Sequence, residues 1–325
     1  MTGVSGRPRV EAERRAPQRS GEAVYGFPPA ELAAAAPEAR QISPLVPGAG
    51  AIEDIPDGAL SRLVVLAPPG TLERRYVLAQ GLRVLAEDGI LVALARKAKG
   101  GARLGGELAA FGCAVREDAR RHHRICQTRR PARALGLAEA IAGGAPRLSS
   151  ALGLWTQPGV FSWDRLDPGT GLLLGHLDGL AGSGADLGCG VGLLALRALQ
   201  SPAVSELACV DIDGRAVEAA RRNIADPRAR FLHADVRAQA PGFRDSGSGA
   251  LDFVVMNPPF HEAGREDRGL GLAFISAAAA LLRPGGVCRM VANIALPYEE
   301  RLKAAFAGAR MLAQRGGYKV YEAIR

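Results

Sequence analysis

The sequence predicts an α/β protein with two domains, each built on a mostly parallel sheet flanked by helices. At 325 residues the chain is longer than one core usually organises, and 48% hydrophobic residues are enough to build two. Short apolar runs alternate with helical stretches, which is typical of parallel sheets. Two stretches of the chain also resemble each other, which indicates a repeated unit.

Residues 1–20 predict a flexible basic tail. They lack the apolar segment that a secretory signal requires, and no apolar run elsewhere reaches transmembrane length. We therefore expect no membrane partner. The arginines of the tail are Arg7, Arg9, Arg14, Arg15 and Arg19.

The cysteines argue against a metal site. There are five of them, an odd number, and they show no paired metal-ligand spacing. Such cysteines are typical of free thiols in a reducing compartment. We therefore expect a cytoplasmic protein that uses no metal, and we expect it to be a monomer.

Residues 21–148 form the first expected domain, and part of their sequence recurs in the second. Residues 63–70 align with residues 253–260, since they read Leu-Val-Val-Leu-Ala-Pro-Pro-Gly and Phe-Val-Val-Met-Asn-Pro-Pro-Phe. A helical stretch follows in both, and residues 85–92 then align with residues 282–289. We interpret the first domain as a duplicate of the second. The alternative is coincidence between two α/β units of similar composition.

The first copy lacks the polar and aromatic groups of the second. Ala67 stands where the second copy has Asn257, and Gly70 stands where it has Phe260. No Asp-x-Gly-x-Gly-x-Gly motif precedes this copy. We therefore predict that the first domain is degenerate and serves as a scaffold or as a docking domain for substrate.

A basic region within the first domain indicates a nucleic-acid partner. Residues 96–133 carry eleven basic and three acidic side chains, a net charge of +8 that equals the formal net charge of the whole chain. Arginine can fork onto phosphate or stack on bases, so we predict RNA docking here. The alternative is a solvated arginine-rich face. The predicted RNA-binding residues are Arg96, Lys97, Lys99, Arg120, Arg121, Arg124, Arg129 and Arg130.

Residues 149–325 form the second expected domain, which contains a glycine loop. Residues 186–192 read Asp-Leu-Gly-Cys-Gly-Val-Gly and precede a helical run. Alternating glycines between a strand and a helix let the backbone approach a cofactor closely. The spacing differs from the Gly-x-Gly-x-x-Gly of dinucleotide sites and favours S-adenosylmethionine (AdoMet). A plain turn or a site for another nucleotide is the alternative.

Two further acidic residues follow apolar strand-like runs. Asp211 ends residues 207–211, 25 residues after Asp186, where a carboxylate can accept both hydroxyls of a ribose. Asp235 ends the next run, where an adenine amino group would need an acceptor. Helix capping is the alternative for Asp211, although Asp213 can take that role.

The run Val-Val-Met-Asn-Pro-Pro-Phe at residues 254–260 predicts a grip for a planar amine. Its two prolines remove backbone donors, so the turn offers the Pro258 carbonyl and the Asn257 side-chain oxygen as acceptors. Phe260 can stack on the ring that carries the amine. The carboxyl ends of parallel strands share one edge of a sheet, so we expect Asn257 to lie in the same crevice as the acidic residues.

Residues 154–325 resemble the small-domain class I methyltransferases that modify ribosomal RNA guanines at N2, the RsmC and RlmG group. Residues 159–174 resemble the lead-in segment of that family, and residues 291–298 and 318–321 resemble its last two strands. One departure is the run 181–185, which is poor in β-branched residues for a strand.

The resemblance implies two tandem Rossmann-like class I methyltransferase domains, the first degenerate, with an antiparallel strand over residues 317–325. It implies methylation of a guanine N2 in ribosomal RNA, and the tail and lead-in favour 16S rRNA of the small subunit over 23S rRNA. The implied AdoMet-binding residues are Phe161, Thr170, Asp186, Gly188, Gly190 and Asp211, with Asp235 added from its position. Asn257, Pro258 and Phe260 are implied to hold the target base.

Other functions stay open on the sequence alone. Release-factor glutamine N5-methyltransferases and adenine N6-methyltransferases use a similar grip but usually carry tyrosine at the position of Phe260. A noncatalytic ribosome-assembly factor would not need an intact glycine loop and Asn257. A nicotinamide dehydrogenase is disfavoured by the glycine spacing.

Overall fold

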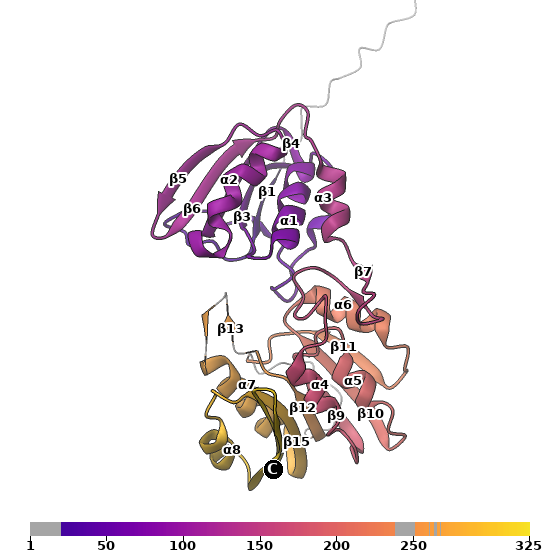
Figure 1. Ribbon diagram of the computed structural model, residues 1–325. Coiled ribbons are helices and arrows are strands. Elements are labelled where there is room, and N and C mark those ends of the chain that lie inside the picture. Colours follow the sequence, from indigo (N-terminus) through magenta and orange to yellow (C-terminus); the bar gives the residue numbers. More distant parts are fainter. Residues whose placement is uncertain (1–20, 238–250, 260, 263–264, 267) are drawn as a thin grey trace, which may run out of the picture.

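The computed structural model describes residues 21–237, 251–259, 261–262, 265–266 and 268–325. These residues form two α/β domains that lie one above the other in Figure 1, which confirms the expected fold class. Both the basic tail expected at residues 1–20 and Phe260 lie outside the described residues. Within the described part of the chain, no helix has the length and apolar character needed to cross a bilayer.

The first domain contains a sheet of six strands in the order β2-β1-β3-β4-β6-β5. The first four strands of that order are parallel, and β6 and β5 run antiparallel to their neighbours. The strands are β1 (Gly21–Tyr25), β2 (Arg40–Gln41), β3 (Leu60–Leu66), β4 (Leu85–Arg96), β5 (Arg116–Arg120) and β6 (His123–Arg129). The helices are η1 (Ile52–Asp54), α1 (Thr71–Val84), η2 (Lys97–Lys99), α2 (Gly101–Ala110) and α3 (Leu137–Gly144).

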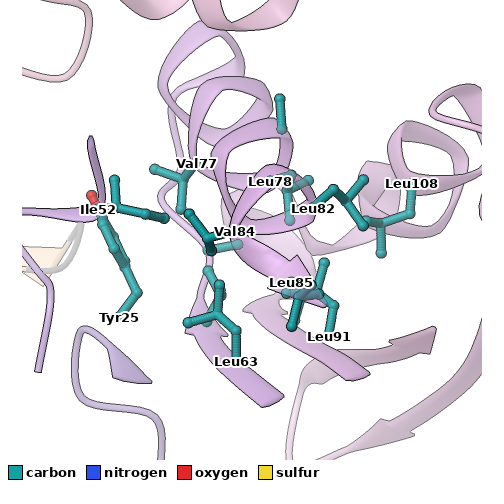
Figure 2. Close-up of a cluster of buried hydrophobic side chains, with 14 of the residues drawn as sticks. Tyr25, Ile52, Leu63, Val77, Leu78, Leu82, Val84, Leu85, Leu91 and Leu108 are labelled. Carbon is teal, nitrogen blue, oxygen red and sulfur yellow. The ribbon is translucent and has the colours of Figure 1, made fainter. Parts of the chain in front are cut away.

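The core of this domain lies between the sheet and α1 (Figure 2). Leu63 of β3 and Leu91 of β4 face Leu78 and Leu82 of α1, and all four side chains are fully buried. Burial of such side chains stabilises a domain by roughly 1.5 to 3 kcal/mol each. The first domain therefore has a hydrophobic core of its own.

A short antiparallel pair connects the domains. It joins β7 (Arg147–Leu148) to β8 (Trp155–Thr156), and the boundary expected between residues 148 and 149 falls inside it. Asn223, at the end of α6 (Gly214–Asn223), donates to the Trp155 carbonyl oxygen and accepts from the Trp155 amide. The connection is thereby attached to the second domain.

The second domain contains a seven-stranded sheet in the order β11-β10-β9-β12-β15-β17-β16. Five strands are parallel, and β17 lies antiparallel between β15 and β16. This confirms the antiparallel strand expected at residues 317–325. The strands are β9 (Gly182–Leu187), β10 (Val204–Asp211), β11 (Ala229–His233), β12 (Leu251–Met256), β15 (Leu282–Asn293), β16 (Gly308–Arg315) and β17 (Tyr318–Ile324).

Helices cover both faces of this sheet, and a small hairpin follows β12. The hairpin strands are β13 (His261–Glu262) and β14 (Arg265–Glu266), and Figure 1 shows β13 reaching toward the first domain. Besides α6, the helices are α4 (Pro168–Leu174), α5 (Leu193–Ala198), α7 (Arg268–Leu281) and α8 (Glu299–Ala305).

The run 181–185 forms a central strand although it is poor in β-branched residues. Strand β9 pairs with β10 and β12 on its two sides, and its residues 184–187 are buried. A Cβ atom added to Gly184 would lie 2.2 Å from the Phe253 ring of β12. The small residue therefore makes room for a buried aromatic ring, and packing outweighs weak strand propensity.

The two sheets share part of their topology. The order β3-β4-β6-β5 matches β12-β15-β17-β16, with one parallel pairing followed by two antiparallel pairings in each. Each parallel pairing also has an irregularity near its start, at Leu60/Arg62 in one sheet and Leu251/Phe253 in the other. The duplication itself remains an interpretation, which this shared topology supports.

Candidate active site

Four polar residues lie at one edge of the second sheet. Asp211 ends β10, Asp186 lies near the end of β9, Asn257 follows β12, and Asp235 lies beyond the end of β11. Because these four strands are parallel neighbours, their carboxyl ends form one edge. The topology therefore brings together the residues that the sequence suggested, while their binding roles remain predictions.

Asp186 is fully buried and only half satisfied. Its Oδ2 accepts a hydrogen bond of 3.1 Å from the Ala195 amide in α5. Its Oδ1 is buried and has no hydrogen-bond partner among the described residues. Burial raises the pKa of this carboxyl to about 8. A buried acceptor without a donor is costly, so Oδ1 fits a site completed by a donor from a ligand.

The glycine loop adopts backbone conformations that other residues avoid. Gly188, Gly190 and Gly192 have φ angles of 73°, 53° and 90°. A Cβ atom added to Gly190 would meet no atom within 4 Å, whereas one added to Gly192 would lie 2.8 Å from Ile224 Cδ1. Gly190 therefore leaves open space in the loop, as a cofactor that approaches the backbone requires, and Gly192 permits close helix packing.

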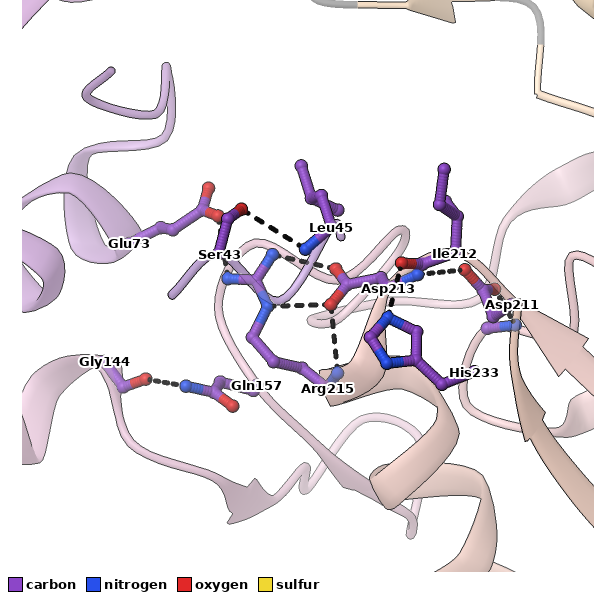
Figure 3. A network of polar contacts seen from close by, with 11 residues as sticks. Ser43, Leu45, Glu73, Gly144, Gln157, Asp211, Ile212, Asp213, Arg215 and His233 are labelled. Carbon is purple, nitrogen blue, oxygen red and sulfur yellow. Dashed lines mark hydrogen bonds and ion pairs between the residues drawn. The ribbon is translucent and has the colours of Figure 1, made fainter. Parts of the chain in front are cut away.

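Asp211 is held in place by two backbone amides. Its Oδ2 accepts from the Gly190 amide at 2.9 Å. Its Oδ1 accepts from the Asp213 amide at 2.9 Å (Figure 3). Burial raises its pKa to about 6. Asp213, rather than Asp211, caps α6 by accepting from the Arg215 amide. Asp211 is therefore not the cap of this helix.

Arg215 connects this cluster to the first domain. Its Nη2 lies 2.8 Å from Asp213 Oδ2, and its Nη1 lies 2.7 Å from Oε1 of Glu73 in α1 (Figure 3). The side chains of Arg215 and Glu73 are each only 11% exposed. The Gly214 amide also donates to the Pro44 carbonyl oxygen at 2.8 Å. This interdomain contact could not be predicted from the sequence, because nothing in the sequence pairs residues so far apart.

Asn257 is fixed by two acceptors. Its Nδ2 donates to Asp167 Oδ2 at 3.0 Å and to Thr170 Oγ1 at 2.8 Å. Asp167 also caps α4 by accepting from the Thr170 amide at 2.7 Å. Thr170, expected from the resemblance to bind AdoMet, is buried and contacts Asn257. The contact of Asp167 with Asn257 could not be predicted from the sequence, because an Asp-Pro pair at a helix start signals only a cap.

The remaining predicted residues of the site lie in different surroundings. Pro258 is buried beside Asn257, and Phe161 is 58% exposed. Both carboxylate oxygens of Asp235 accept from the Arg237 side chain, at 2.9 to 3.0 Å. Burial raises the pKa of Asp235, but the Arg237 hydrogen bonds outweigh this and lower it below its usual value. An adenine amino group would therefore share Asp235 with Arg237.

The predicted RNA-binding residues divide into two groups. Arg96, Lys97 and Lys99 are exposed at the end of β4 and in η2, and no ion pair or hydrogen bond of their side chains occurs within the described ranges. We name these three the open basic cluster. The others contact protein groups, in the pairs Arg120–Asp118, Arg121–Glu31, Arg124–Glu117, Arg129–Asp88 and Arg130 with the Leu85 carbonyl oxygen.

The described residues contain no group of three or more His, Cys, Asp or Glu side chains that could hold a metal ion. The five cysteines are free and buried, and burial raises the pKa of each thiol. Buried thiols with a raised pKa are poor nucleophiles, so these cysteines contribute to packing.

Comparison with known proteins agrees with this geometry. The model of the methyltransferase small domain family matches residues 151–322. Ribosomal RNA small subunit methyltransferase C of Pseudomonas aeruginosa (strain LESB58) is 33% identical over 315 residues, which cover 92% of this chain and 93% of that protein. The namesake from Idiomarina loihiensis is 39% identical over 169 residues, 52% of this chain and 48% of that protein.

A solved structure matches both domains. The T. thermophilus 16S rRNA N2 G1207 methyltransferase (RsmC) in complex with AdoMet and guanosine has a TM-score of 0.74 and 26% sequence identity. The match covers 94% of this chain and 88% of that protein. The resemblance seen in residues 154–325 therefore extends to the first domain as well. The chain belongs to the methyltransferase small domain family and, within it, to the ribosomal RNA small subunit methyltransferase C group.

Proposed function

We propose that this protein transfers the methyl group of AdoMet to the exocyclic N2 of a guanine in 16S rRNA of the small ribosomal subunit. The observation that carries the proposal is the pairing of β12 with β9, which places the Asn257 turn next to the Asp186 and Gly190 loop. An amine acceptor and a cofactor loop are then neighbours. The similarity to an enzyme solved with AdoMet and guanosine supports the same assignment.

The residues of the cofactor loop have separable roles in this proposal. Asp211 accepts hydroxyl groups of the ribose, and its carboxylate is already oriented by two amides. Gly188 and Gly190 bring the loop backbone close to the cofactor, with open space at Gly190, while Asp186 offers its unpaired Oδ1 to a donor. AdoMet supplies a methyl group on a sulfonium, which leaves as a neutral thioether when the N–CH3 bond forms.

The residues of the Asn257 turn orient the nucleophile. Guanine N2 is a weak nucleophile because its lone pair is delocalised into the ring. The Asn257 Oδ1 and the Pro258 carbonyl oxygen accept its two hydrogens, direct the lone pair at the methyl group and stabilise the positive charge that develops on nitrogen. The methylated nitrogen then releases a proton to water. We expect Phe260 to replace the stacking that the flipped base loses.

We further propose that the first domain is a degenerate copy, in which a side chain of the same domain occupies the turn that contains Pro68 and Pro69. Arg74 is fully buried, and its Nη1 donates to the Pro69 carbonyl oxygen at 2.7 Å and to that of Pro68 at 3.3 Å. Glu107 holds the same guanidinium through two hydrogen bonds of 2.7 Å. These prolines align with the turn that grips the target amine in the second domain. The guanidinium therefore contacts the Pro68 carbonyl oxygen, which aligns with the Pro258 carbonyl oxygen that we propose as one acceptor for the amine.

The open basic cluster is the part of the first domain that best fits RNA phosphate. Its three side chains lie at the carboxyl end of β4 and in η2, and α1, which begins at the same end of the sheet, contacts the second domain through Glu73. Unpaired exposed cations can bind phosphate without first breaking an ion pair. We propose that this cluster positions rRNA beside the second domain, and that the enzyme acts as a cytoplasmic monomer.

Methyl transfer from labelled AdoMet tests the proposed function. Isolated small subunits, large subunits, naked rRNA and release factor serve as substrates for the unaltered protein and for Asn257→Ala. We expect N2-methylguanine in 16S rRNA and a loss of at least about 100-fold with Asn257→Ala, because its acceptor is lost. Methyl label in 23S rRNA or in release factor instead would show that 16S rRNA is not the substrate. Tight RNA binding without methyl transfer would favour an assembly factor.

A further inference from the structure

We propose that Asp167 is a positioning residue that holds the Asn257 amide with its oxygen toward the target amine. The inference rests on the proposed function, because it specifies how the same site recognises its substrate. Asp167 lies in the segment before α4, 90 residues before Asn257, and contacts it directly. Its carboxylate decides which of two nearly identical amide orientations is adopted.

The hydrogen-bonding capacity of the groups determines the orientation of the amide. An amide side chain presents an oxygen acceptor and a nitrogen donor of similar size, so either can face a ligand. An ionised carboxylate can only accept. Asp167 Oδ2, at 3.0 Å, therefore requires the nitrogen of Asn257. The oxygen is left for the opposite side, where it can accept from an amine.

Thr170 completes the arrangement but does not decide it. Its hydroxyl can donate or accept, so it would pair with either end of an amide. At 2.8 Å from Asn257 Nδ2, it takes the second hydrogen of that nitrogen. Both donors of the amide are thereby used. Of Asp167, Thr170 and Asn257, only the carboxylate of Asp167 distinguishes the two orientations of the Asn257 amide.

The segment that carries Asp167 is anchored on the sheet. The Asp167 Oδ2 accepts the Thr170 amide at 2.7 Å and so closes the first turn of α4. A Cβ atom added to Gly169 would lie 2.7 Å from the Tyr318 ring of β17, so this turn packs closely on the sheet. The position of the carboxylate relative to Asn257 is therefore fixed by packing as well as by the hydrogen bond.

The negative charge also strengthens the acceptor. A carboxylate that accepts from the amide nitrogen polarises the amide and increases the partial negative charge on its oxygen. That oxygen faces the nitrogen on which positive charge develops during methyl transfer. Asp167 thus assists the step through Asn257, without touching the substrate.

A reciprocal exchange of the two residues tests the proposal. Asn257→Asp alone places two carboxylates about 3 Å apart, and one of them must then hold a proton at neutral pH. In the double variant Asp167→Asn with Asn257→Asp, the amide oxygen at position 167 keeps the hydrogen bond from the Thr170 amide, and its nitrogen turns to donate to the carboxylate at position 257, whose second oxygen faces the amine. Above the raised pKa of this pair, we expect the single Asn257→Asp variant to lose at least about 100-fold in kcat, and the double variant to recover about tenfold or more.

The pH dependence separates positioning from a purely structural role. In Asn257→Asp the shared proton restores a single acceptor toward the base, so its activity should fall as the pH rises through the raised pKa of the pair. The double variant should show no such fall. Asp167→Ser keeps a good helix cap and removes the carboxylate. It should lower kcat about tenfold while AdoMet affinity, measured by calorimetry, changes less than threefold.

Several outcomes would overturn the inference. These are full activity of Asp167→Ser, no recovery in the double variant, or an identical pH profile for the single and double variants. Thermal unfolding of every variant identifies loss of folding as a separate cause. If the unaltered protein methylates no guanine in any substrate, the proposed function fails and the exchange has no activity to report. The two failures are therefore distinguishable.

Discussion

Glu73 Oε1 and Arg215 Nη1 lie 2.7 Å apart, although 142 residues separate them in the chain. The contact joins α1 of the first domain to the start of α6, immediately after the strand that ends in Asp211. Arg215 also holds Asp213, whose amide donates to Asp211. The first domain is therefore part of the support of the proposed ribose acceptor.

Substitution of Glu73 should weaken both the fold and the cofactor site. Glu73→Ala leaves a buried guanidinium with only Asp213 as a partner, and we expect a loss of about 2 to 3 kcal/mol in the free energy of unfolding. AdoMet affinity should fall severalfold through Asp213 and Asp211. Chemical denaturation and calorimetry measure the two effects. The exposed Glu300, paired with Lys303, is a matched control, and Glu300→Ala should change neither quantity by much.

Two glycines of the cofactor loop should respond differently to alanine. Gly190→Ala adds a methyl group to open space, so the fold should lose only about 1 kcal/mol from backbone strain, while AdoMet affinity falls at least tenfold. Gly192→Ala drives the same methyl group into Ile224, so stability should fall more. Thermal unfolding and AdoMet binding are measured for both variants. Normal AdoMet binding by Gly190→Ala would contradict this prediction.

Asp186 should make the stability of the cofactor-free protein fall as pH rises. Its folded pKa of about 8 exceeds the usual value of 3.8, because burial disfavours the charged form. The folded state therefore binds more protons between these values, and stability is lost as pH rises through them, by at most about 1.4 kcal/mol per pH unit. Asp186→Asn should remove this slope. Urea denaturation between pH 6.5 and pH 8, above the pKa of about 6 of Asp211, measures it, and an unchanged slope would contradict the assignment.

Arg74 should be essential for the stability of the first domain. Arg74→Ala leaves Glu107 buried without its partner and removes the donors to the Pro68 and Pro69 carbonyl oxygens, so we expect a loss of about 3 to 5 kcal/mol. Arg74→Lys should recover little, because an ammonium cannot form the two-pronged contact with Glu107. Limited proteolysis of the full chain should show cleavage within the first domain. If both variants were as stable as the unaltered protein, the contacts of Arg74 with Glu107 and with the two proline carbonyl oxygens would not stabilise the first domain.

The open basic cluster should dominate the salt dependence of RNA binding. Lys97→Ala with Lys99→Ala removes two unpaired cations, and the slope of log affinity against log salt should fall by about 1.4 to 1.8. Arg120→Ala with Arg121→Ala removes the same charge, but from side chains paired with Asp118 and Glu31. We expect a smaller effect from this matched pair. Equal changes of the salt slope in the two double variants would indicate that RNA docks over the whole basic region of residues 96–133.

Several features could be predicted from the sequence because they depend on local pattern. Alternating apolar runs and glycine spacing determine strands and a loop, and polar residues at the ends of parallel strands must share an edge. This reasoning placed Asp186, Asp211 and Asn257 correctly at one edge of the sheet. The run 181–185 shows its limit, since the packing of Gly184 against Phe253, and not propensity, explains β9.

By itself, the sequence determined the two-domain α/β fold, the order of the site residues along the chain and the family. Only the tertiary structure decided how those residues are oriented and supported. Asp167 faces Asn257, Arg74 fills its own turn, and Glu73 meets Arg215 because packing brings distant segments together. The physical reason is that sequence periodicity specifies which face of an element is buried, whereas the pairing of particular charges depends on how whole elements pack.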